Sequence, residues 1–242
     1  QHERGNPSDN RYQIERIDDG QHADEAVDAA LDVLKNHRDE KPFYLNMGTI
    51  ETHESRWNRP DRHNRRAVYN IDDRPQTKVP GFLPDVDILR TELRGLRAAT
   101  EFLDHHIGRL LNYLDESGLA ENTWVLFTTD HGISGVRSKS TIYDAGVETT
   151  LLARGPGLAN PGRHEQALIQ NIDILPTLAE LAGLERPHWT QGKSFAPLLT
   201  AAPYQPHDMI FIERNAHGGD VDHMRSVRTP AYHLIYHVDP NR

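Results

Sequence analysis

The stretch VLFTTDHGISGVRSK, residues 125–139, places an aspartate, a histidine and a lysine directly after a run of residues that favour a β-strand. Asp130 and His131 are adjacent where that pattern stops, so both side chains can turn toward one cation and offer it an oxygen and a nitrogen. Gly132 permits a sharp turn of the backbone. Lys139 could then bring a positive charge to an anion held on that cation.

The same tripeptide also has a purely structural interpretation. Aspartate and glycine are common in turns, and a solvated histidine or a surface lysine needs no ligand. Spacing alone therefore leaves both interpretations open, and the choice depends on the surrounding elements.

Helices and strands are expected to alternate around this segment. Apolar residues at helical spacing predict helices over residues 23–37, 86–118 and 171–184. Strands are predicted over residues 43–47, 122–130 and 148–154, and residues 54–84 are predicted to form a long loop. The tail after Met209 alternates apolar and polar residues, as antiparallel strands do. We therefore expect an α/β domain over residues 1–200 and the start of a β-rich subdomain over residues 201–242.

The composition excludes several classes of protein. The 242 residues are 36% hydrophobic and 26% charged, as in globular proteins, and no apolar run approaches a membrane span. A net charge of −9 without a basic stripe argues against a general nucleic-acid binder. The absence of cysteine excludes disulfides, thiolate metal sites and a cysteine nucleophile within this sequence.

Several ordered motifs resemble the sulfatase family. WVLFTTDHG followed by KSTIYDAGVETTLLARGPG is similar to the family signature of an apolar strand, Asp-His/Asn-Gly, a basic residue, Tyr-x-x-Gly and a second strand. KPFYLNMGTIETH, NIDILPTLAELAGL and QGKSFAPLLT resemble further family segments and follow the family's order. The resemblance covers roughly residues 23–240 and is nearest to the sulfamidases, which hydrolyse N-sulfoglucosamine.

The resemblance implies an α/β fold like that of alkaline phosphatase. Such a fold is a sandwich with a central mixed, largely parallel sheet flanked by helices, and here a small C-terminal antiparallel sheet would follow. The implied activity is metal-assisted hydrolysis of a sulfate ester or N-sulfate on a sulfated small molecule or glycan. The alternatives are a phosphoryl or phosphonate hydrolase of the same superfamily and a non-catalytic carbohydrate-binding remnant. Oligomeric state and cellular location stay open.

The family pattern also implies roles for individual residues. Asp130 and His131 match two ligands of a divalent metal, for which calcium is the expected ion. Lys139 matches the basic residue that contacts the sulfate. His53 matches the histidine that contacts the sulfate or protonates the leaving group, a role that fits general acid catalysis. The family's proline neighbours of this histidine are absent from ETHESRW, and a plain loop histidine is the alternative.

Four side chains are candidates for recognising a sugar: Trp57, His217, His223 and Arg225. Trp57 could stack on a ring face, and His217, His223 and Arg225 could reach a carboxylate or sulfate. The alternative is that Arg225 is an edge-strand charge and that the histidines are solvated. Asp173 matches a family position but is interpreted as a structural residue at a helix N-terminus.

The resemblance leaves one family segment unmatched. Sulfatases carry an N-terminal segment with paired aspartates and a Cys/Ser-x-Pro-x-Arg motif, whose first residue is oxidised to the nucleophile formylglycine. This sequence contains no cysteine and no Ser-x-Pro-x-Arg. We therefore expect the C-terminal two-thirds of a longer sulfatase, inactive alone, with formylglycine in the missing segment; the alternative is a natural remnant without hydrolase activity.

Overall fold

The structure is a computed structural model that describes residues 22–37, 41–53, 65–217 and 220–238. The chain divides into two compact units, Gln1–Ser117 and Gly118–Arg242. None of the helices in the described ranges is long and apolar enough to cross a membrane. The predicted domain boundary at residue 200 stays a prediction.

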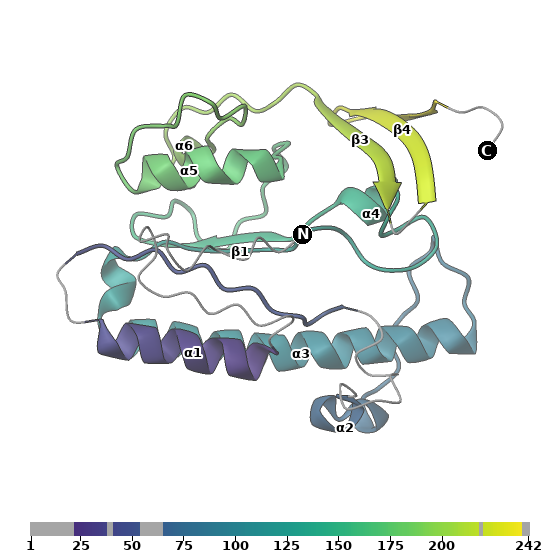
Figure 1. The fold of residues 1–242 in the computed structure, drawn as a ribbon, viewed down its shortest axis with the longest axis horizontal. Coiled ribbons are helices and arrows are strands. Elements are labelled where there is room, and N and C mark those ends of the chain that lie inside the picture. The colour runs from purple at the N-terminus through teal and green to yellow at the C-terminus, as the bar shows by residue number, and fades with distance from the viewer. Residues whose placement is uncertain (1–21, 38–40, 54–64, 218–219, 239–242) are drawn as a thin grey trace. The chain divides into compact units, whose positions relative to one another are not determined.

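Two helices packed against each other form the frame of the first unit: α1 (Ala23–Asn36) and α3 (Asp87–Glu116) (Figure 1). Both confirm the helices predicted from apolar spacing, because their buried residues recur every three or four positions. On α1 these residues are Ala23, Ala26, Val27, Ala30, Leu31 and Leu34. Beyond α3, Gly118 has a φ of 76°, the left-handed conformation that commonly ends a helix.

The segment after residue 64 contains two short helices, α2 (Arg66–Tyr69) and η1 (Ile71–Asp73). Tyr69 and Ile71 are fully buried and share a core cluster with Ala98 and Ala99 of α3. The predicted loop is therefore wrong in its described part. One-turn helices contain too few residues to show a period, so the sequence pattern could not reveal them.

Residues 43–47 form no strand with any part of the chain that the structure describes, so the strand predicted there was wrong. Their side chains nevertheless alternate between partly buried and exposed. Alternation reports an extended segment with one covered side, whereas a strand also needs a hydrogen-bonded neighbour.

In the second unit, β1 (Val125–Thr128) pairs with β2 (Leu151–Arg154) in an antiparallel register. Both strands were predicted. The described strands contain no parallel pair, so the largely parallel sheet expected of this fold class is not formed by these residues. The connection between β1 and β2 contains the one-turn helix α4 (Asp144–Val147) instead of the crossover helix that usually joins parallel strands.

Three short helical elements of this unit lie near one buried carboxylate: η3 (Asn171–Asp173), α5 (Ile174–Leu181) and α6 (Ala196–Leu199). Asp173 precedes α5 and is fully buried. It accepts hydrogen bonds from the backbone N–H groups of Gln170 and Lys193 at 2.9 and 2.7 Å, and His207 Nε2 lies 3.0 Å from it. The predicted structural role of Asp173 is confirmed.

The chain closes its described part with an antiparallel sheet of order β3-β4-β5. Its strands are β3 (Ile210–His217), β4 (Asp220–Arg228) and β5 (His233–His237), and Figure 1 shows β3 and β4 as neighbouring arrows. This confirms the antiparallel strands predicted from alternation.

Another short helix of the second unit, η2 (Leu119–Asn122), precedes β1.

Candidate functional site

Asp130 and His131 lie just beyond the end of β1, as predicted, and their side chains face each other. The distance from His131 Nε2 to Asp130 Oδ1 is 3.6 Å. The Asp130 side chain is 88% exposed, whereas that of His131 is partly covered. His131 Nδ1 lies 2.7 Å from the carbonyl oxygen of Gly132. A carbonyl only accepts, so Nδ1 carries the hydrogen and Nε2, on the Asp130 side, keeps the lone pair in the neutral ring.

This arrangement fits part of a metal site. Metal-binding histidines usually donate their second ring N–H to a carbonyl or carboxylate, which fixes the tautomer, and His131 does so. Together with the Asp130 oxygen, it offers two donors suited to a divalent cation. Within the residues that the structure describes, no group of three or more His, Asp or Glu side chains could hold a metal. Asp130 and His131 can therefore supply only a share of the ligands.

The loop that carries Lys139 is fixed by its own backbone. Lys139 N–H donates to the carbonyl of Ile133 at 2.8 Å, and Gly132 N–H donates to the carbonyl of Gly146 at 2.9 Å. A Cβ atom on Gly132 would lie 2.1 Å from the Ala145 oxygen, so only glycine fits against α4 at this point. Hydrogen bonds therefore join the segment that follows the metal-ligand candidates, Asp130 and His131, to the segment that carries Lys139, the candidate for contacting an anion.

Two residues on either side of Lys139 have left-handed backbone conformations. Arg137 has a φ of 55° and Ser140 a φ of 69°. Residues other than glycine adopt this conformation at a cost of about 1–3 kcal/mol each, and it persists where the surrounding structure determines it. The position of Lys139 therefore depends on the packing around the loop.

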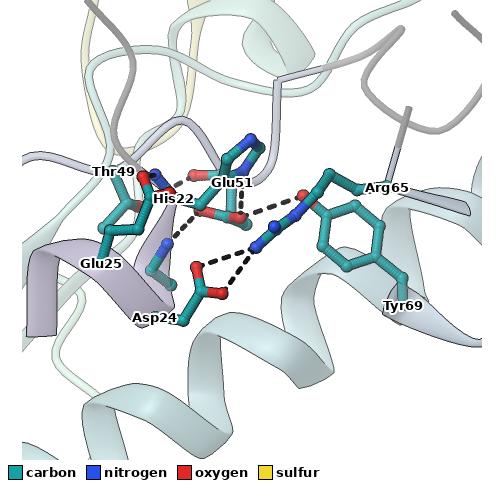
Figure 2. Close-up of polar contacts among 8 residues, drawn as sticks. His22, Asp24, Glu25, Thr49, Glu51, Arg65 and Tyr69 are labelled. Carbon is teal, nitrogen blue, oxygen red and sulfur yellow. Dashed lines mark hydrogen bonds and ion pairs between the residues drawn. The ribbon is translucent and has the colours of Figure 1, made fainter. Parts of the chain in front are cut away.

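His53 follows a turn that a buried carboxylate anchors, and Figure 2 shows this anchor. His53 N–H donates to the Ile50 carbonyl at 2.8 Å, which closes the turn, and the His53 side chain is exposed. The Glu51 side chain inside the turn is 0% exposed. It accepts hydrogen bonds from His22 Nδ1 at 2.8 Å, from Ala23 N–H at 2.8 Å and from the Tyr69 hydroxyl at 3.0 Å.

An ion pair between Arg65 and Asp24 lies beside the Glu51 carboxylate, and the charges in this group shift the pKa values of their neighbours. Arg65 Nη2 lies 2.8 Å from both carboxylate oxygens of Asp24 (Figure 2). Burial alone would raise the pKa of Asp24, but the hydrogen bond and charge of Arg65 outweigh burial and lower it. Burial also raises the pKa of Tyr69, and the Glu51 carboxylate raises it further. The Tyr69 hydroxyl therefore keeps its proton and can donate it to Glu51.

The structure brings two of the predicted sugar-recognition residues together on the C-terminal sheet. Arg225 Nη2 donates to Asn215 Oδ1 at 2.9 Å, and His223 Nδ1 lies 3.3 Å from the same oxygen. Arg225 Nε is also 3.4 Å from Glu213 Oε2. Arg225 lies on β4, the central strand, so the alternative that it is an edge-strand charge was wrong. His217 lies at the end of β3, and Trp57 lies outside the described residues.

Sequence reasoning missed the residues that hold these segments in place: Glu51, Tyr69, Asp144 and His233. Their contacts join positions far apart in the chain, such as Glu51 with Tyr69 and Asp144 with His233. Local spacing contains no signal for such pairs. A hint was the position of Glu51 two residues before His53, inside the motif itself.

Comparison with known proteins identifies the family. The sulfatase family model matches residues 2–184, and the model of the N-sulphoglucosamine sulphohydrolase C-terminal region matches residues 132–241. The first match spans more than half of the chain and includes Asp130, His131 and Lys139. The chain therefore belongs to the sulfatase family, as its motifs predicted.

Relatives and solved structures agree with this assignment. An ulvan-active sulfatase of Formosa agariphila is 26% identical over 240 residues, covering 86% of this chain and 39% of that protein. An endo-4-O-sulfatase of Bacteroides thetaiotaomicron is 28% identical over 227 residues, covering 84% and 44%. The chain thus spans less than half the length of these two relatives. The structure of BT4656 in complex with its substrate D-glucosamine-2-N,6-O-disulfate has a TM-score of 0.71 at 18% identity, covering 93% of this chain and 62% of that one. This likeness confirms the α/β fold class.

Proposed function

We propose that the protein hydrolyses a sulfate ester or an N-sulfate group with the help of a divalent metal. The observation that carries the proposal is the Asp130–His131 pair, whose carboxylate oxygen and imidazole nitrogen face each other directly after β1. This pair lies within the part of the chain that the sulfatase family model matches.

Asp130 and His131 would hold the metal, and calcium is the proposed ion. Because His131 Nδ1 donates a hydrogen bond to the Gly132 carbonyl, the lone pair of Nε2 stays available to a metal ion. A bound cation would supply Lewis-acid stabilisation of negative charge on the sulfuryl group. The remaining ligands and the formylglycine nucleophile are proposed to come from sequence outside this chain, which contains no cysteine.

Lys139 and His53 would act on the charges of the reacting group. Lys139 brings an ammonium group to the loop that is tied to Gly132 and α4, where it would neutralise a sulfate oxygen. His53, exposed at the end of the turn that Glu51 anchors, would donate a proton to the leaving oxygen or nitrogen. Protonation matters because an expelled amine or alkoxide is a poor leaving group.

A sulfated carbohydrate is the proposed substrate class. Support comes from the match to the N-sulphoglucosamine sulphohydrolase C-terminal region, from the ulvan-active and endo-4-O-sulfatase relatives, and from the disulfated glucosamine in the structurally similar BT4656 complex. The exposed group of Asn215, His223 and Arg225 is proposed to contact a further charge on the sugar, because it presents hydrogen-bond donors and positive charge. His217 and Trp57 stay candidates for the same role.

The test is turnover of glucosamine N-sulfate, an aryl sulfate and an aryl phosphate by the full-length protein. Lys139→Ala and His53→Ala should each lower kcat/KM about 100-fold or more, whereas the exposed Lys78→Ala and His188→Ala should not. Chelation should abolish turnover, and Ca²⁺ should restore it. Faster turnover of the phosphate would favour the phosphoryl hydrolase alternative, and absence of turnover would favour the carbohydrate-binding remnant.

A further inference from the structure

A hydrogen-bonded row of three side chains links the C-terminal sheet to α4. His233 Nδ1 lies 2.7 Å from Asp144 Oδ1, and His233 Nε2 lies 3.0 Å from Ser226 Oγ. The three residues come from β5, α4 and β4, and 89 positions separate His233 from Asp144 in the chain. The ionised carboxylate only accepts, so Nδ1–H donates to Asp144 and the neutral ring accepts the Ser226 hydroxyl hydrogen at Nε2.

The order serine, histidine, aspartate is also found where a serine acts as a nucleophile. Here Ser226 is only 7% exposed and lies in the middle of β4, opposite Ile212 of β3 and Ile235 of β5. A substrate cannot reach a hydroxyl in that position. The histidine therefore serves to hold α4, because its ring binds Asp144.

Contacts that fix α4 also fix the loop over residues 132–141, which follows the metal-ligand candidates Asp130 and His131 and contains Lys139. Gly146 in α4 packs against this loop so closely that a Cβ atom would lie 2.3 Å from the Ser138 oxygen. Its carbonyl accepts the Gly132 N–H, next to His131. Ser138, next to Lys139, is fully buried under these contacts.

The loop needs such support because of its backbone conformation. Arg137 and Ser140 are both left-handed, with φ of 55° and 69°, so the loop would relax if α4 moved away. The Asp144–His233 contact fixes the first residue of α4 to the sheet. The His233 side chain is 8% exposed, so this contact is shielded from water on the histidine side.

We propose that His233 is a positioning residue for the loop over residues 132–141, which contains Lys139. Through Asp144 it holds α4 against residues 132–141, and thereby keeps His131 and Lys139 in place. The structural part of this inference stands on the contacts alone, while its consequence for turnover rests on the proposed function.

Two substitutions of His233 separate the contact with Asp144 from the contact with Ser226. His233→Asn places an amide near the position of Nδ1 and can still donate to Asp144, whereas His233→Gln places its amide near Nε2 and reaches Ser226 instead. Asp144→Ala removes the same contact from the other side, and Ser226→Ala is the matched control. Hydrogen exchange at the Gly132 and Lys139 amides, which donate to Gly146 and Ile133, reports on the loop without requiring turnover.

In the full-length protein, His233→Gln and Asp144→Ala should speed exchange at both amides about tenfold, as expected for the loss of one charge-assisted hydrogen bond. The same two variants should lower kcat and raise the Ca²⁺ concentration for half-maximal activity. His233→Asn and Ser226→Ala should stay within about threefold of the wild type.

Unchanged exchange in His233→Gln and Asp144→Ala would overturn the proposal, even if the melting temperature falls. If the wild type does not hydrolyse sulfate, the proposed function fails, while the exchange rates still decide whether His233 holds the loop.

Discussion

The turn that carries His53 and the loop that carries Lys139 are held in opposite ways. Side chains anchor the turn, since a buried Glu51 carboxylate accepts hydrogen bonds from His22, Ala23 N–H and Tyr69. Backbone packing anchors the loop, because Gly132 and Gly146 allow main-chain atoms to approach where a side chain would collide. The exposed His53 and the partly buried Lys139 are thus held by different contacts, which are electrostatic in the first unit and steric at the glycines of the second.

This difference decides which substitutions each segment tolerates. A carboxylate anchor depends on charge and hydrogen bonding, so an amide of the same size preserves its shape and weakens it only in part. A glycine contact with backbone has no such intermediate state, because added atoms displace main chain instead of a flexible side chain. At its glycine contacts the loop should therefore respond to a single methyl group, whereas the turn should respond to a change of charge at Glu51.

The largest effect is expected from Gly146→Ala. The new Cβ would lie 2.3 Å from the Ser138 oxygen and 2.8 Å from the Thr141 oxygen, both of which are backbone atoms. We expect destabilisation of about 3 kcal/mol, at the upper end of typical overpacking costs. Activity of the full-length protein should fall below detection, as measured by turnover of an aryl sulfate.

Gly108→Ala is the matched control for this substitution. Gly108 lies inside α3, and a Cβ there would meet nothing within 4 Å. Alanine favours a helix over glycine by about 0.8–1 kcal/mol, so this variant should unfold at a higher temperature. A fully active Gly146→Ala protein would show that steric packing does not hold the loop.

The sequence predicted the long elements and the position of Asp130 and His131 after β1 better than it predicted contacts between distant residues. Helices α1 and α3 repeat their apolar pattern over several turns, so neighbouring residues alone define them. The Asp130–His131 pair was placed correctly after β1 because strand and motif are continuous in the chain. Both predictions depend only on residues that are neighbours in the sequence.

What could not be predicted depends on partners distant in sequence. The alternation in residues 43–47 gave no information on whether a neighbouring strand exists, and α2 and η1 are too short to show a period. The contact between Glu51 and Tyr69 forms only once α2 packs on α3. Anchors of this kind become visible only when the fold brings the residues together.

A smaller effect is expected from Glu51→Gln. The amide keeps the volume and one acceptor oxygen, but it loses the charge and presents an N–H₂ group to donors that already point at it. We expect a loss of about 1–3 kcal/mol, as for hydrogen bonds to a charged group. Exchange of the His53 amide, which donates to Ile50, should accelerate while the Gly132 amide stays unchanged. The exposed Glu121→Gln serves as control, and equal exchange at His53 in both variants would refute the electrostatic anchor.

The smallest effect concerns pH and tests whether acid weakens the first unit selectively. His106 is buried on α3, its ring centroid 4.5 Å from that of Phe102, and Arg109 Nη1 lies 2.9 Å from His106 Nδ1. Burial lowers the pKa of His106 below its ordinary value of 6.5, and the positive charge of Arg109 lowers it further. The other charged or titratable groups that influence it are Asp24, His105 and Asp28.

Because the unfolded chain binds this proton more readily, the stability contributed by neutral His106 is complete above pH 6.5 and is lost as the pH falls through the lowered pKa. His106→Gln should therefore flatten the decline in unfolding free energy between pH 7 and pH 5, measured by urea denaturation. The exposed neighbour variant His105→Gln should keep the wild-type slope. The Gly132 amide in the second unit should exchange at a rate that His106→Gln does not alter at either pH, because the contacts that hold the loop, at Gly132, Gly146 and His233, do not include His106. A change at Gly132 that follows His106 would remove the distinction between the two anchors.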